Sequence, residues 1–231
     1  GEAGAPQISY SGYIGSQQII NSMDLMNGYE FVRLQAERDP VGSQLTYFND
    51  GKTLEDYRSV PSSDWQQHIF RDGVMHNHSL SVMGGNSNTK YSVSGNIFGQ
   101  QGIIIHSGFD RKQGKITLDQ SFQKLKVGIN AMYTGTLTDG SNPAAPESAF
   151  SAMNYLMYSV WGYRPIAFAD EDLLNDPTDD LANPTNDYRF NPILSAQNEL
   201  RKNYNNRLIV NGYAEYAFSS ALKLRINGGI N

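Results

Sequence analysis

Acidic side chains crowd one stretch of this 231-residue chain, and they are the first candidates for chemistry. Seven carboxylates and no Lys or Arg fall between residues 170 and 187. Hard cations such as Ca²⁺ bind several oxygen ligands at close quarters, which makes Asp170, Asp172 and Asp176 candidate calcium ligands. The stretch lacks the loop glycine and the bidentate acid that an EF-hand requires. A solvated acidic loop is the simpler interpretation, and we predict no metal site there.

Other reactive residue types give weaker patterns. His76 and His78 share a face of any strand, but no third metal ligand is evident, so ordinary hydrogen-bonding histidines are favoured. The Ser-x-x-Lys pattern of penicillin-recognising enzymes occurs at 87–90 and 121–124. That chemistry needs the Ser at the start of a buried helix, whereas both matches fall in predicted hairpins. With no Cys and no phosphate-binding glycine loop, we predict neither an enzyme nor a cofactor.

Aromatic residues gather in one region beside an arginine, and they could bind a ligand. Flat aromatic faces bury a large area at a low entropy cost, so such residues suit stacking on sugar rings or peptide groups. The candidate contacts are Trp161, Tyr163 and Arg164, with Tyr155, Tyr158 and Phe168 nearby. The alternative is that these aromatics form the small core of their own loop.

Composition excludes several classes of protein. Lys and Arg number 18 against 23 Asp and Glu, a net charge of −5, which argues against nucleic-acid binding. Without Cys the chain is not a disulfide-stapled scaffold. No run approaches the roughly 18 apolar residues of a membrane-spanning helix, a test that does not detect alternating β-barrel strands.

Alternation of apolar and polar residues predicts seven strands, each with one apolar face. Several approach the length of a tilted strand that crosses a bilayer, about 9 to 11 residues. The predicted strands span residues 7–14, 77–84, 89–98, 113–122, 124–133, 207–218 and 222–230.

Short and long connections alternate between these strands. Three links have the size of hairpin turns, whereas 15–76 and 135–206 are long and 99–110 is intermediate. Tight turns on one side and long loops on the other are typical of outer-membrane β-barrels. We expect helices inside the long connections at 24–34, with Asp24 at its start, and at 63–70 and 149–158.

The order of several short motifs resembles the start of the barrel in SusC/RagA-type TonB-linked outer-membrane transporters. The resemblance covers nearly the whole chain except 135–200. The motifs that carry it are Ser11-Gly12-Tyr13-Ile14-Gly15, Asp24-Leu25-Met26-Asn27, Asp64-Trp65-Gln66-Gln67-His68-Ile69-Phe70, His78-Ser79-Leu80-Ser81-Val82, Thr89-Lys90-Tyr91-Ser92-Val93, Gln101-Gly102-Ile103-Ile104, Phe109-Asp110-Arg111 and Tyr213-Ala214-Glu215-Tyr216.

The resemblance implies a 22-stranded barrel in a Bacteroidota outer membrane. Such proteins import oligosaccharides or peptides with a SusD-like lipoprotein as partner and take energy through TonB. The fold class we expect is all-β and mainly antiparallel: residues 1–231 as an incomplete barrel segment in outer-membrane lipid, with 15–76 and 135–206 as extracellular loops.

The two ends of the chain lead us to expect a fragment. The plug domain through which the TonB complex acts would precede Gly1, and the remaining barrel strands would follow Asn231, where an alternating segment is cut in mid-course. The competing interpretation is a soluble or surface β-rich domain for ligand binding or adhesion, with no membrane-spanning role.

Overall fold

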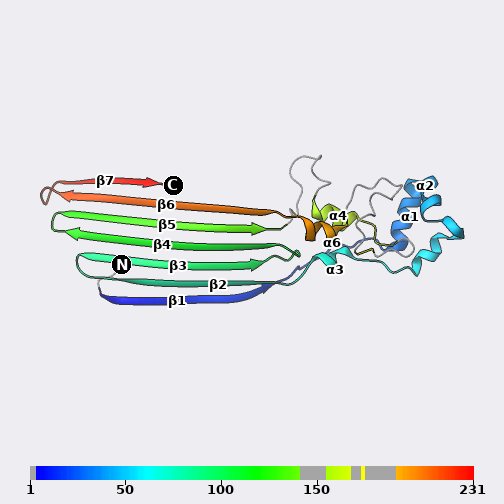
Figure 1. The fold of residues 1–231 in the computed structure, drawn as a ribbon, viewed down its shortest axis with the longest axis horizontal. Coiled ribbons are helices and arrows are strands. Elements are labelled where there is room, and N and C mark those ends of the chain that lie inside the picture. Colours follow the sequence, from blue (N-terminus) through cyan, green and yellow to red (C-terminus); the bar gives the residue numbers. More distant parts are fainter. Residues whose placement is uncertain (1–3, 141–154, 168–172, 175–190) are drawn as a thin grey trace.

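A seven-stranded antiparallel sheet forms one part of the molecule, and helical connections extend from one of its ends (Figure 1). The structure is a computed structural model and describes residues 4–140, 155–167, 173–174 and 191–231. The strands follow one another across the sheet in the order of the sequence. They are β1 (Gly4–Gln17), β2 (Gly73–Gly85), β3 (Thr89–Gln101), β4 (Gly108–Phe122), β5 (Leu125–Asp139), β6 (Lys202–Ala217) and β7 (Lys223–Ile230).

Short turns lie at one end of the sheet and the longer connections at the other (Figure 1). Residues 86–88, 123–124 and 218–222 make the short turns between β2 and β3, β4 and β5, and β6 and β7. In the first of these, the side-chain oxygen of Asn86 accepts hydrogen bonds from the backbone N–H groups of Asn88 and Thr89, both at 2.8 Å. The predicted seven strands and their alternating connections are confirmed.

Six of the seven strands are longer than predicted, mainly at the loop end, whereas β7 begins one residue later than predicted. Strand β6 begins at Lys202 rather than at residue 207, and β5 continues to Asp139 rather than ending at residue 133. These extensions pair with each other, and the ammonium group of Lys202 lies 3.9 Å from the Asp139 carboxylate. Apart from Leu137 and Tyr204, the residues of both extensions are polar or glycine, so the alternation is weak there. Backbone pairing with the neighbouring strand holds these residues extended.

Side-chain caps define the helices of the first long connection. Helix α1 (Gly28–Arg38) starts at Asn27, not at the predicted Asp24, because Asn27 and Glu30 form a capping box with both hydrogen bonds at 3.0 Å. Helix α3 (Trp65–Ile69) begins after Asp64, within the predicted range. Sequence analysis missed three short helices here: α2 (Pro40–Thr46), η1 (Asn49–Gly51) and η2 (Leu54–Arg58).

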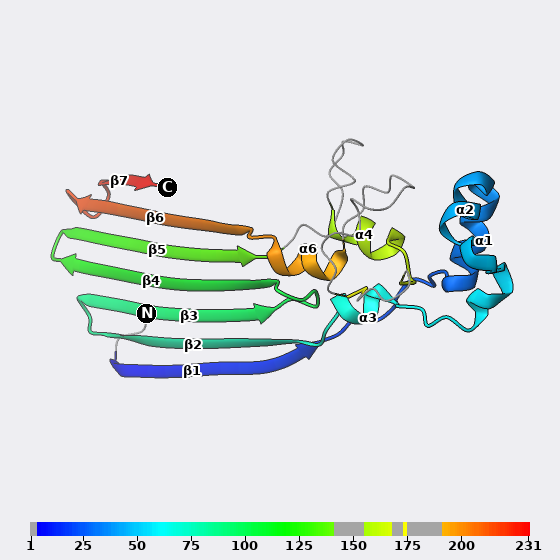
Figure 2. The ribbon, with the colours of Figure 1, turned by 45° about the vertical axis from the view of Figure 1, so that its right-hand side comes forward.

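The second long connection holds α4 (Leu156–Gly162) and α6 (Pro192–Asn198) among the described residues. Residues 149–154 of the helix expected over 149–158 lie outside the described ranges; α4 includes residues 156–158 and continues to Gly162. Helix α4 ends before Arg164 because a residue that precedes proline avoids helical backbone angles. Figure 2 shows α3, α4 and α6 next to the loop end of the sheet, with α1 and α2 farther out.

Two small cores stabilise the helical part. The inner core joins α3, α4 and α6 around Trp65 and Ile69, and Ile104 from the β3–β4 connection packs against it. The outer core joins α1, α2 and η2 around Val32 and Tyr47, and Ile166 from the second long connection completes it. All three longer connections therefore fold together into one helical layer over the end of the sheet.

No helix within the described ranges has both the length and the apolar character needed to cross a membrane.

Candidate functional site: the two faces of the sheet and the polar hollow

The outer face of the sheet is apolar and has no protein packed against it. Register places one apolar residue of each strand in a single row, so their side chains share a face. This row is Ile8, Val82, Val93, Ile116, Ala131, Val210 and Ile230. Ile8 is 73% exposed and Ile116, in the middle of the sheet, is 52% exposed. An apolar face this wide on a soluble protein would be covered, so it marks a surface for membrane or protein contact.

Burial confirms that the strands lack a hydrophobic core of their own. Every buried hydrophobic side chain in the described part of the chain lies in the long connections, and none lies on a strand. Hydrophobic stabilisation of the sheet must therefore come from contacts outside the chain, with lipid or with another protein surface. Lipid on one face and water on the other would produce this alternation.

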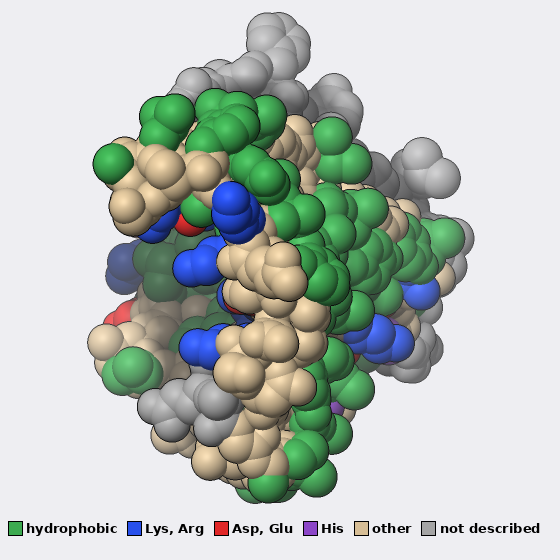
Figure 3. Space-filling model, turned by 90° about the vertical axis from the view of Figure 1, so that its left-hand side faces the viewer, with side chains coloured by type: hydrophobic (Ala, Val, Ile, Leu, Met, Phe, Trp, Pro, Cys, Tyr) green, Lys and Arg blue, Asp and Glu red, His purple; other side chains and the backbone are tan. Residues whose placement is uncertain are grey.

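The inner face is polar and concave. Figure 3 looks along the sheet from its turn end and shows Lys and Arg side chains gathered in the hollow of the sheet, with hydrophobic side chains over the convex side. The register assigns to this face the cations Lys90, Arg111, Lys115, Lys126, Arg207, Lys223 and Arg225, against the carboxylates Asp119 and Glu215. The inner face therefore carries an excess of positive charge.

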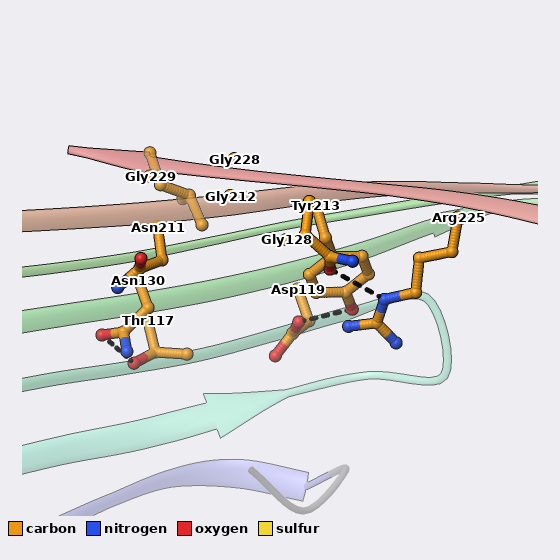
Figure 4. A pocket seen from close by; sticks show the side chains of 12 residues that line it. Thr117, Asp119, Gly128, Asn130, Asn211, Gly212, Tyr213, Arg225, Gly228 and Gly229 are labelled. Atoms are coloured by element: carbon orange, nitrogen blue, oxygen red, sulfur yellow. Dashed lines mark hydrogen bonds between the residues drawn. The ribbon is translucent and has the colours of Figure 1, made fainter.

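A hollow of about 510 Å³ lies on this face between β4 and β7 (Figure 4). Its polar lining includes Thr117, Asp119, Asn130, Asn211, Tyr213, Arg225 and Asn227. Hydroxyl, carboxylate, amide and guanidinium groups thus converge on one place, with Gly128 and Gly229 among the residues between them.

Tyr213 and Arg225 organise the hollow. The Tyr213 hydroxyl donates a hydrogen bond of 2.8 Å to the Asp119 carboxylate, and the Arg225 guanidinium carbon lies 4.1 Å from the centre of the Tyr213 ring. Arg225 Nε also donates to the side-chain oxygen of Asn227 at 3.1 Å, and its Nη1 lies 3.8 Å from the Glu215 carboxylate. Stacking on a ring and charge pairing hold the guanidinium in place.

Gly128 makes room for this arrangement. It lies directly opposite Tyr213 in the register, and a Cβ at Gly128 would collide with the Tyr213 ring. The ring therefore lies over Gly128 on β5, and its hydroxyl reaches Asp119 on β4. Chemically, the hollow offers hydrogen bonds and charge to a polar ligand or a polar protein segment.

The candidate ligand contacts Trp161, Tyr163 and Arg164 lie at the end of α4, and the structure separates them. The Trp161 side chain is 47% exposed, whereas Tyr163 and Arg164 are buried. Tyr163 packs edge-on against Trp65, with ring centroids 5.2 Å apart, and Trp65 Nε1 donates to the Arg164 carbonyl oxygen at 3.0 Å. Arg164 Nη1 donates to the Ile166 carbonyl oxygen at 2.5 Å. Tyr163 and Arg164 thus belong to the loop core, and ligand contact by the three residues stays a prediction.

Hydrogen bonds lower the pKa values of two carboxyl groups of η2 in the helical layer. The Asp56 carboxylate accepts hydrogen bonds from the backbone N–H and the hydroxyl of Thr53, at 2.7 and 2.9 Å, which lowers the pKa of Asp56. A hydrogen bond from Arg58 likewise lowers the pKa of Glu55. Both groups cap or brace a helix on the surface and do not face the polar hollow.

Comparison with known proteins identifies the sheet. No family model matches the chain. The chain is 24% identical to TonB-dependent receptor P3 of Formosa agariphila over its full length, and 27% identical to TonB-dependent receptor SusC of Bacteroides thetaiotaomicron over 98% of its length. The RagAB peptide importer in its open-open state superposes on 98% of the chain with a TM-score of 0.66 at 18% identity.

The chain resembles a segment of a SusC/RagA-type TonB-dependent receptor. It spans 21% and 22% of the two curated relatives and 27% of the solved chain. Its sheet corresponds to part of the RagA barrel, and its place is the outer membrane. TonB-dependent receptors are transporters, so these relatives also confirm the prediction that the chain is not an enzyme.

The competing soluble interpretation does not fit this receptor segment, because an exposed apolar face would be unprotected in water. The calcium candidates Asp170, Asp172 and Asp176 lie outside the described ranges. His76 and His78 do lie together, with ring centroids 5.5 Å apart, and the Tyr10 hydroxyl and His78 Nδ1 are joined by a hydrogen bond of 2.7 Å. No group of three potential metal ligands occurs among the residues described.

Sequence analysis missed the polar hollow of this SusC/RagA-type segment. Its residues were visible only as the polar positions of alternating strands, which any half-buried sheet contains. One signal was present: Gly128 interrupts the polar side of the clearest strand, and a glycine within a strand often marks a close approach by another group. The register of β5 and β6 was needed to name Tyr213 as that group.

Proposed function

We propose that the receptor carrying this segment imports oligosaccharides or peptides across the outer membrane together with a SusD-like lipoprotein. The observation that carries the proposal is the two-faced sheet, with an apolar outer face and a polar, cationic hollow inside. In an outer-membrane barrel these faces meet lipid and the lumen, respectively. Energy would come from TonB through a plug domain.

The helical layer is placed at the cell surface by this proposal, since long loops of such barrels lie outside. There it would contribute to docking of the lipoprotein and to capture of the ligand, with Trp161 as the exposed aromatic contact. The similarity to a peptide importer supports peptides, while aromatic and amide groups suit oligosaccharides equally well. Both substrate classes therefore enter the test.

Uptake by cells that lack the receptor tests the import step. We expect the deletion strain to lose growth on one class of nutrient, either peptides or oligosaccharides, as the sole source, and the intact gene to restore it. Trp161→Ala should weaken uptake at low nutrient concentration, while Tyr158→Phe, a conservative change at the neighbouring exposed aromatic of α4, should not. Unchanged growth of the deletion strain on every peptide and oligosaccharide tested would contradict import.

Purification of the tagged receptor in detergent tests the partnership. A lipoprotein should be retained at a fixed ratio through size exclusion, and deleting its gene should abolish uptake of the same nutrient. A receptor that purifies alone and imports without a lipoprotein would contradict the second half of the proposal.

A further inference from the structure

A groove of about 380 Å³ crosses the outer face of the sheet, away from the inner hollow. Gly95 on β3 and Gly114 on β4 lie directly opposite each other and form its floor. Leu80 on β2 lies on one side, and Tyr133 on β5 lies on the other. The volume is within the range of ligand pockets, about 300–1,000 Å³, and the lining is almost wholly apolar.

The floor is open because the neighbouring tyrosines lean away from it. Tyr10 and Tyr133 lie in the same row as the two floor glycines, yet each covers a different glycine, one row nearer the loops. A Cβ at Gly12 would lie 2.8 Å from the Tyr10 hydroxyl oxygen, and a Cβ at Gly135 would lie 3.2 Å from that of Tyr133. A Cβ at Gly114, by contrast, would meet nothing within 4 Å.

Hydrogen bonds hold both tyrosines in these positions. The Tyr10 hydroxyl is bonded to His78 Nδ1 at 2.7 Å, and the Tyr133 hydroxyl donates to the side-chain oxygen of Asn206 at 2.8 Å. Neither ring can swing over the floor without losing its bond. The groove is therefore a fixed feature of the face and not a gap that a side chain fills.

A cation stands at the loop end of the groove. Lys112 lies two residues before Gly114 on the same face of β4, opposite Ile97, whose side chain adds to the apolar lining. Within the described part of the chain no ion pair involves Lys112. The Asp110 carboxylate lies one row farther toward the loops. A long lysine side chain on a lipid-facing surface directs its ammonium group to the interface, where lipid headgroups lie.

We propose that this groove binds one acyl chain of an anionic membrane lipid whose phosphate contacts Lys112. The apolar floor matches a hydrocarbon tail, and the cation matches the negative headgroup of a lipid in the leaflet at the loop end. A protein partner fits less well, because the groove opens on the face that lies in lipid. Lipid binding here is separate from import, so failure of one proposal leaves the other standing.

Photo-crosslinking of the complete receptor in nanodiscs tests the site. The probe is phosphatidylglycerol with a diazirine in one acyl chain, diluted in phosphatidylcholine, and the labelled residues are read by mass spectrometry. Phosphatidylcholine with the same diazirine tail is the matched lipid. We expect phosphatidylglycerol to label Leu80, Ile97 and Tyr133 about fivefold more than phosphatidylcholine does, the factor for one lysine near an anionic lipid.

Two variants and one control locate the binding. Gly114→Leu fills the floor and should reduce labelling at Leu80 and Tyr133 to the level of Leu224, which lies on the same face but away from the groove. Lys112→Gln should remove the preference for phosphatidylglycerol while keeping labelling by the tail. Gly228→Leu makes the same change at another open glycine of the outer face and should match the wild type.

Uniform labelling of the outer face, or equal labelling by the two lipids in the wild type, would overturn the proposal. Equal effects of Gly114→Leu and Gly228→Leu would do the same. Folding of each variant is checked by its heat-dependent migration in detergent gels. If Gly114→Leu does not fold, Gly95→Ala narrows the same floor with a single methyl group and gives the same readout.

Discussion

Two glycines on neighbouring strands should respond differently to the same substitution. Gly128 on β5 lies beneath the Tyr213 ring, and a Cβ there would also lie 2.6 Å from the Asp119 carboxylate. Gly114 on β4 faces open space on the other side of the sheet. Replacing each with alanine adds one methyl group, to a filled position in the first case and to an empty one in the second.

The expected magnitudes follow from two effects. Alanine in a strand removes the conformational cost of glycine, which is about 0.5–1 kcal/mol at either position. At Gly128 the added methyl group also overpacks a filled site, which costs about 1–3 kcal/mol. The glycine effect cancels in the comparison, so the Gly128→Ala receptor should be less stable than the Gly114→Ala receptor by about 1–3 kcal/mol.

The assay is denaturant unfolding of the complete receptor in lipid or detergent, compared at the transition midpoint. A double-mutant cycle isolates the contact, because removing the ring with Tyr213→Ala leaves space for the methyl group. In that background Gly128→Ala should cost less than in the wild type, because the ring is gone and the Asp119 carboxylate, released from its hydrogen bond with Tyr213, can move away from the methyl group. Equal stability of the two glycine variants, or full additivity in the cycle, would refute the reasoning that the Tyr213 ring occupies the site.

Three further results are expected. Val93→Arg places a charge on the outer face and should reduce the folded, membrane-inserted fraction in gels by an amount equivalent to about 2–4 kcal/mol, whereas Ser92→Arg, on the inner face, should insert normally. Trp65→Ala should destabilise the helical layer by about 3–5 kcal/mol. Amide hydrogen exchange should then become faster in α3 and α4 and stay unchanged in the strands. If exchange rose more in the strands than in α4, the prediction would be wrong. Hydrogen bonds from Thr53 lower the pKa of Asp56 below its ordinary value of 3.8. The stabilisation that these bonds give is therefore present above pH 3.8 and lost as the pH falls through the lowered pKa. Protection of η2 amides from hydrogen exchange should decline in acid for the wild type and change less with pH for Asp56→Asn.

The strands were predictable because alternation acts over many residues at once. Lys124, Lys126 and Asn130 on one side of a strand and Leu125 and Val127 on the other leave no competing helical pattern. The same reasoning failed at strand ends, where pairing with a neighbour replaces side-chain pattern as the cause of structure. It also failed for α2, whose start depends on a cap by Asp39 and on Pro40 rather than on an apolar repeat.

Alternation alone did not say what the apolar face meets. A soluble sandwich and a membrane sheet share the same period, and both place residues such as Ile116 on one side. The difference lies in burial: half of the Ile116 side chain is exposed, while Ile69 in the helical layer is completely buried. In the sequence, the order of the motifs along the chain favours the membrane interpretation. In the structure, the exposure of the apolar strand residues favours it independently.

Glycines show most clearly why the site needed the fold. In the sequence, Gly95, Gly114 and Gly128 all interrupt alternating strands, the first two on the apolar side and Gly128 on the polar side. Register places a tyrosine opposite two of them. Gly128 lies opposite Tyr213, whose ring fills its space, whereas Gly114 lies opposite Tyr133, whose hydroxyl bonds to Asn206 and whose ring leaves the space above Gly114 open. A close packing contact on the inner face and an open groove on the outer face therefore arise from the same pairing of glycine with tyrosine, and the hydrogen bond of each tyrosine decides between them.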